Sequence, residues 1–184
     1  ELFNLTTGFR SSVFQPLYRF IYFIPLAMLG FSAIDILFMH SICQTWGVLV
    51  HTKYIKRMPA WVEMIFVTPS HHRVHHASNI LYLDRNMGMF LIIWDRMFNT
   101  FQDEVEWEKV KYGLTKNVEK INPITVWNHE WIAIWKDLKR SDKWSDKLKY
   151  IFYPPGWSHD GSSKTTNELR EEINLDFTPE HLKI

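Results

Sequence analysis

The chain has 184 residues, of which 46% are hydrophobic and 16% aromatic, and its formal net charge is +1 at pH 7. This length permits one domain with a buried core, and a charge so close to zero gives no whole-chain argument for nucleic-acid binding. Because Cys43 is the single cysteine, an internal disulfide framework is excluded.

The segment 14–51 is the most apolar part of the chain. Pro25 and the patch 30–32 predict a break within it, so we expect two helices, at about 16–29 and 33–51. The second helix would extend roughly 28 Å, about the thickness of the hydrocarbon core of a bilayer, whereas the first is short for a full span. Two membrane spans, a re-entrant hairpin and a buried hairpin of a soluble protein all fit this pattern.

Aromatic flanks and basic residues after the second helix favour a membrane location. Lys53, Lys56 and Arg57 follow the helix directly, and such residues concentrate on the cytoplasmic side of a membrane. We therefore expect an integral membrane protein in which His51, next to these residues, lies near the cytoplasmic face.

Three polar residues of the second helix, His40, Gln44 and His51, fall within a stripe about 40° wide. Polar residues at membrane depth usually face a bundle interior and carry a function. We predict that His51 is a metal ligand and that Gln44 supports the site. His40 lies roughly 16 Å deeper, so we expect a hydrogen-bonded interior histidine there instead.

Four of the nine histidines lie between His71 and His76, after Ser70, which predicts a helix start near His71. On this helix His72, His75 and His76 share a face, and three imidazoles on one face predict a metal site. His71 lies off that face and is expected to reach a second ion or to support a ligand. A merely polar surface cluster would not account for the apolar sequence on both sides.

Polar residues after the histidines are candidates for orienting the imidazole N–H groups: Asn79, Asp84, Asn86 and Asp95. The first three are also turn formers. Asp95 stands beside Arg96 in an apolar run, where an internal ion pair and a solvated helix end are equally compatible with the sequence.

The second half of the chain is more polar and predicts amphipathic helices at about 123–140 and 145–152, after a short one at 59–67. The helix at 123–140 places three tryptophans on its apolar face, which suits a bilayer surface, with packing on the protein core as the alternative. A polar tail follows from Ser158, with a possible helix near 166–173. The fold class we expect is all-α: a membrane-embedded helical bundle with interfacial amphipathic helices.

These motifs together resemble the fatty acid hydroxylase/sterol desaturase superfamily of integral-membrane di-iron enzymes. The resemblance is carried by His72-x-x-His75-His76, Asn79, Leu83-Asp84-Arg85-Asn86 and the run from Trp94 to Phe101. Two further stretches are similar to its alkylglycerol monooxygenase branch: Tyr112-Gly113-Leu114-Thr115 and Pro154-Pro155-Gly156-Trp157. The resemblance covers residues 1 to about 157 as one membrane domain and leaves 158–184 as a polar tail.

The resemblance implies an O₂-dependent enzyme that hydroxylates a lipid C–H bond with two irons. The branch further implies a reduced pterin as electron donor, for which we locate no site, and we assign no catalytic residue beyond the metal ligands. The expected partners are a membrane lipid and the bilayer, and no nucleic acid. Two alternatives stand: a sterol desaturase or fatty acid hydroxylase with a different electron donor, and a non-catalytic metal-binding membrane protein.

The chain departs from the family by lacking two upstream histidine clusters. The segment 1–5 resembles the stretch that follows the second cluster, and the chain begins at Glu1 rather than at methionine. We therefore expect a C-terminal fragment that lacks part of the iron ligands and is inactive alone. Met87 and Asn99 replace the family's usual tyrosine and glycine, which leaves the ligands intact but bears on the substrate.

Overall fold

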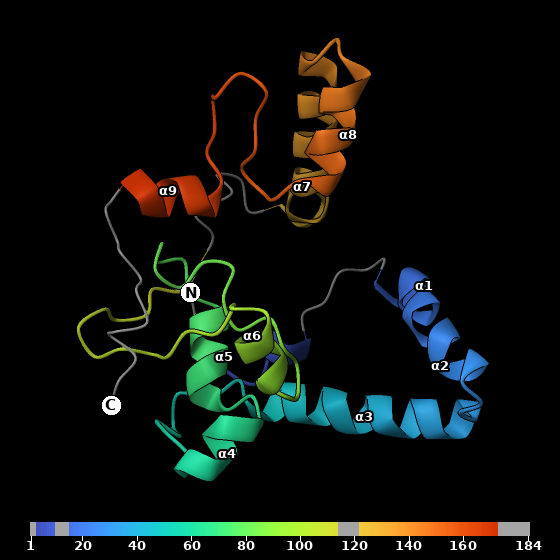
Figure 1. Ribbon diagram of the computed structural model, residues 1–184, viewed down its shortest axis with the longest axis vertical. Helices are drawn as coiled ribbons and strands as arrows, with labels where there is room; N and C mark the ends of the chain where they lie inside the picture. The colour runs from blue at the N-terminus through green and yellow to red at the C-terminus, as the bar shows by residue number, and fades with distance from the viewer. Residues whose placement is uncertain (1–2, 10–14, 114–121, 173–184) are drawn as a thin grey trace. The chain divides into compact units, whose positions relative to one another are not determined.

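The computed structural model describes residues 3–9, 15–113 and 122–172, and within them the chain is helical with no strand. Its elements are η1 (Thr7–Phe9), α1 (Gln15–Arg19), η2 (Phe20–Phe23), α2 (Ile24–Met28), α3 (Ala33–Leu49), α4 (Ala60–Ile65), α5 (Pro69–His75), α6 (Ile93–Met97), α7 (Pro123–Arg140), α8 (Trp144–Phe152) and α9 (Thr166–Glu172) (Figure 1). They form two compact units, one of 1–77 with 84–112 and one of 78–83 with 113–184. Leu114, Thr115 and the tail beyond Glu172 lie outside the described residues.

The apolar N-terminal segment breaks where the sequence predicts, and its first helix is further divided into α1, η2 and α2. Pro25 stands in the first turn of α2, and Gly30 adopts a positive φ of 93°. Ser32 then caps α3, because its Oγ accepts a hydrogen bond from the backbone N–H of Asp35 at 3.2 Å. α3 has 17 residues, and no helix among the described residues is both long and apolar enough to cross a membrane.

α3 ends at Leu49, two residues earlier than predicted, so His51 follows the helix rather than belonging to it. Trp46 ties this end of α3 to the centre of the first unit. Its indole N–H donates to the carbonyl oxygen of Val67 at 2.8 Å, and its ring contacts those of Phe66 and Phe90. The chain just after α3 is thereby brought beside the start of α5.

α5 begins at Pro69, with Thr68 as its N-cap, two residues before the start that the sequence predicted near His71. Proline is favoured at the first helical position, since its missing N–H has no helical partner there. The Ser70 hydroxyl instead donates to the Glu63 carboxylate at 3.0 Å. Val67 and Val74, on either side of this start, have no exposed surface and belong to the core of the unit.

The short amphipathic helix predicted at 59–67 is α4 in the first unit, and the second unit contains the longer amphipathic helices. α7 runs over the predicted residues, and α8 and α9 lie within one residue of their predicted bounds. α7 and α8 pack side by side as a hairpin (Figure 1). Their large apolar side chains remain exposed at Trp131, Trp135, Trp144 and Phe152.

Candidate metal centre

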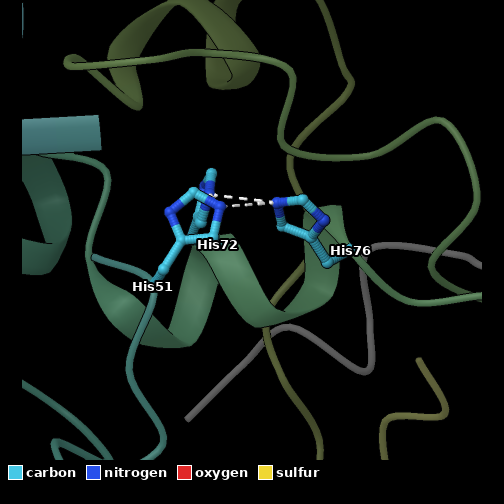
Figure 2. Close-up of side chains that lie close together, drawn as sticks. All are labelled: His51, His72 and His76. Carbon is cyan, nitrogen blue, oxygen red and sulfur yellow. Dashed lines mark hydrogen bonds between the residues drawn. The ribbon is translucent and has the colours of Figure 1, made fainter. Parts of the chain in front are cut away.

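Three imidazoles of the first unit converge on one point (Figure 2). His72 is on α5, His76 follows the end of that helix, and His51 comes from the segment after α3. The Nε2 atom of His51 lies 3.0 Å from that of His72 and 3.0 Å from that of His76, and the last two are 3.2 Å apart. The cluster therefore joins His51 to two residues that lie 21 and 25 positions later in the sequence.

The second ring nitrogen of His51 fixes its orientation. Nδ1 lies 2.6 Å from the carbonyl oxygen of Gly47 and donates to it, which leaves the Nε2 lone pair facing the cluster. Gly8 allows η1 to approach the same ring, because a Cβ atom there would lie 3.0 Å from both His51 Nδ1 and Val48 Cα. His51 is buried as a result.

Burial keeps the imidazoles of His72 and His76 neutral. Removal from water, followed by the neighbouring imidazoles, lowers the pKa of His72 to about 2 and that of His76 to about 4. At neutral pH the imidazoles of the cluster are therefore uncharged, as metal ligands must be.

The spacing of the three nitrogens fits a metal ion. Nitrogens held about 2.1 Å from one ion are about 3.0 Å apart in octahedral and about 3.4 Å apart in tetrahedral geometry. The distances of 3.0 to 3.2 Å within the cluster lie in this range, so the three nitrogens could hold one metal ion. Imidazole is a ligand for iron as well as for zinc and copper.

His75 does not join the three converging nitrogens. Its ring stacks on that of His72 with centroids 5.4 Å apart, and it forms hydrogen bonds with the backbone of Arg85 and Asn86. Successive helical residues point about 100° apart, so His75 and His76 diverge although both lie near His72. His75 as a ligand stays a prediction.

His71 is fully buried on the far side of α5, close to Glu63 and Asp103. Its Nδ1 accepts a hydrogen bond from the backbone N–H of Thr68, and burial lowers its pKa. Glu63 Oε1 already accepts from the N–H of Met58 at 2.9 Å and from Ser70 Oγ. This group anchors the start of α5, and a second ion at His71 stays a prediction.

Asn86 and Asp95 hold backbone segments in place and do not contact the three converging rings. The Asn86 amide donates to the carbonyl oxygens of His71, at 3.1 Å, and Gln102, at 2.7 Å. The buried Asp95 carboxylate accepts from the N–H groups of Met87 and Gly88 at 2.7 and 2.8 Å. Both alternatives considered for Asp95 were therefore wrong: it is neither solvated nor paired with its neighbour Arg96, whose guanidinium lies 3.7 Å from the centroid of the Phe101 ring.

The other predicted supporting residues lie in turns or on α3. The Gln44 amide is 3.4 Å from His40 Nε2, so it contacts His40 rather than His51. Asp84 is exposed with a positive φ of 53°, as a turn former can be. Asn79 belongs to the second unit, where its carbonyl oxygen accepts from the N–H of Tyr82. A role for these three at the imidazoles stays a prediction.

Sequence reasoning missed Arg73, which is buried within the histidine block. Its guanidinium pairs with Glu104 at 2.6 Å and donates to the carbonyl oxygens of Thr52, Ile55 and Lys56. The residues after His51 are thereby fastened to α5, and His51 is kept beside His72. The sequence did offer a signal for this residue, because Arg73 is a charged residue between His72 and His75.

The sequence of this chain is similar to a protein-family model and to several known proteins. The model of the fatty acid hydroxylase family matches residues 1–100. The chain is 39% identical to the alkylglycerol monooxygenase of Homo sapiens over 176 residues, which are 94% of this chain and 37% of that protein. It is 31% identical to an ornithine lipid hydroxylase of Rhizobium tropici over 97 residues (53% of this chain, 29% of that protein). It is also 30% identical to a Delta(7)-sterol 5(6)-desaturase of Schizosaccharomyces pombe over 110 residues (58% and 31%). The chain thus spans less than two fifths of the length of these relatives, and no solved structure matches it.

Proposed function

The chain belongs to the fatty acid hydroxylase family, and on this basis we propose that it is part of an O₂-dependent, iron-containing membrane enzyme that hydroxylates a lipid C–H bond. The observation that carries the proposal is the convergence of three neutral imidazoles at the spacing of metal ligands. An alkylglycerol is the preferred substrate class, because the relative of that name matches 94% of the chain.

In this proposal His51, His72 and His76 hold iron, with His75 and His71 as further ligands, and residues outside this chain complete a site for two irons. Iron supplies the activation of dioxygen that an unreactive C–H bond requires. The protein's own residues keep the imidazoles neutral by burial and fix the His51 tautomer through Gly47. Arg73 holds the segment that carries His51 in place.

We further propose that the α1–α3 region is embedded in the bilayer with the metal centre on the cytoplasmic side. α3 presents apolar side chains to its surroundings, with Ile34 78%, Leu37 60% and Phe38 64% exposed. Such a surface matches hydrocarbon better than water. Lys53, Lys56 and Arg57 follow at the end that carries His51, as the positive-inside rule expects. The exposed tryptophans of the α7–α8 hairpin suit the bilayer surface.

The proposal is tested by activity and metal content together in the intact protein. We expect iron to copurify and an alkylglycerol to be oxidised when oxygen and a reduced pterin are supplied. His72→Ala should abolish turnover and lower the iron content, while His159→Ala, at an exposed histidine of the second unit, should change neither. Product formation only from a sterol or a fatty acid would favour the desaturase or fatty acid hydroxylase alternative. Bound iron without oxygen consumption would favour a non-catalytic metal protein.

A further inference from the structure

We propose that Phe3 and Tyr112 form an aromatic cover that limits the access of water to a metal held by the histidine cluster. The proposal rests on the metal site described above and adds to it a role for two residues that are not ligands. Both residues lie in the first unit, as the cluster does.

Phe3 is the inner layer of this cover. Only 5% of the residue is exposed, and its ring is nearly parallel to that of His51, with centroids 5.4 Å apart and planes inclined by 26°. The same ring meets His76 edge-on at 5.4 Å and lies 6.2 Å from the ring of His72. One phenyl group therefore touches the three imidazoles that converge.

Tyr112 is the outer layer. Its ring stacks on Phe3 with centroids 4.9 Å apart and planes inclined by only 10°. An isolated β-bridge between Tyr112 and Ala77 fixes its backbone next to the end of α5. The Lys53 ammonium group lies 4.5 Å from the centroid of the tyrosine ring and adds a cation–π contact.

The chemistry of this stack suits exclusion of water. Neither phenyl face nor edge offers water a strong hydrogen bond, so solvent gains little by entering between the rings and the imidazoles. Burial also raises the pKa of Tyr112 to about 12, which keeps its hydroxyl uncharged at neutral pH. A metal leaving the cluster, or a chelator approaching it from this side, must first displace Phe3.

Metal release measures the cover independently of turnover. The intact protein, loaded with Co²⁺, is mixed with an excess of EDTA, and the loss of the cobalt absorption bands gives the release rate. Phe3→Ala should accelerate release at least about tenfold, and Phe3→Leu, which keeps an apolar side chain without a ring, by a smaller factor. Phe3→Tyr and Tyr112→Phe keep both rings and should release cobalt at the parent rate, while Tyr112→Ala should release it faster.

Two controls separate the cover from general destabilisation and from the metal site itself. Tyr150→Ala removes a ring that contacts Trp157 in the second unit and should lower the unfolding temperature without changing the release rate or the cobalt spectrum. If Phe3→Ala and Phe3→Leu bind cobalt but release it at the parent rate, the cover is wrong and the metal site stands. If the parent protein binds no cobalt at these histidines, the metal site fails, and the cover with it.

Discussion

Two histidines of the first unit, His40 on α3 and His51 just after it, have different surroundings. His40 Nε2 accepts a hydrogen bond from the Arg19 guanidinium at 2.9 Å, so its lone pair is already used. The Nδ1–H group of His51 donates a hydrogen bond to a backbone carbonyl, so its Nε2 lone pair faces the Nε2 atoms of two other imidazoles. The hydrogen-bond partner of each ring, rather than its place in an apolar segment, decides which histidine is available to a metal.

The largest effect is expected from Arg73, which holds the segment that carries His51. Arg73→Ala removes the ion pair with Glu104 and leaves three carbonyl groups without their donor. Because Arg73 is buried and Glu104 is partly exposed, the loss should lie at the lower end of the range of about 3–5 kcal/mol of unfolding free energy that breaking a fully buried pair costs. Unfolding in detergent should show this loss, together with a lower metal content.

Lys56→Ala is the matched control for Arg73, because the Lys56 side chain is exposed and only its carbonyl oxygen contacts the guanidinium. It should leave both stability and metal content unchanged. Arg73→Lys should recover part of the stability, since one ammonium group cannot replace the forked guanidinium. A fully stable Arg73→Ala variant with normal metal content would show that His51 is positioned by other contacts.

Removing each histidine in turn tests whether His51, and not His40, binds the metal. His51→Ala should weaken metal binding by at least about 100-fold, because it deletes a ligand rather than a supporting contact. His40→Ala should leave the affinity within experimental error. Equal losses in the two variants, measured by competition with a chromophoric chelator, would mean that α3 acts on the site as a whole.

The folding stability of the metal-free protein should also depend on pH. Folding lowers the pKa of His72 to about 2 and of His76 to about 4, from about 6.5 in the unfolded chain. Between these values the unfolded chain binds more protons than the folded protein, so stability should fall as the pH drops from about 6.5 towards 4. Thermal unfolding of the metal-free protein would show this decline. A variant with both His72→Gln and His76→Gln should show a smaller decline, because burial also lowers the pKa of His51, His71 and His75.

The smallest effect is expected at Arg19. Arg19→Ala removes the donor to His40 and should lower the unfolding free energy by only about 0.5–1.5 kcal/mol, as for an ordinary hydrogen bond. The freed imidazole has no convergent partner, so the metal content should stay the same. An additional bound metal in this variant, counted by elemental analysis, would contradict the requirement for convergence.

The sequence predicted helix bounds well where the apolar period was long and regular, and less well for the helix that carries the histidines. α7 matched its predicted bounds because Asn122-Pro123 and a sustained apolar period mark it. The start of α5 was misplaced because Thr68 and Ser70 are both capable caps, and their tertiary partners decide between them.

Within the candidate site, the histidine block itself was predicted and its surroundings were not. His51 was expected at the end of a helix and lies just beyond it, yet it still meets His72. The sequence did not predict that Phe3 and Tyr112 cover the histidines, because their contacts join distant parts of the chain. The partners of Asp95 are backbone N–H groups, which only the folded chain brings together.

X-ray absorption at the iron edge of the intact protein shows whether His51, His72 and His76 bind one metal. We expect imidazole nitrogens as iron ligands and a reduced imidazole contribution in both His51→Ala and His76→Ala. His40→Ala should give the parent spectrum. Iron without imidazole scattering, or a spectrum that neither ligand substitution changes, would show that these histidines do not bind the iron.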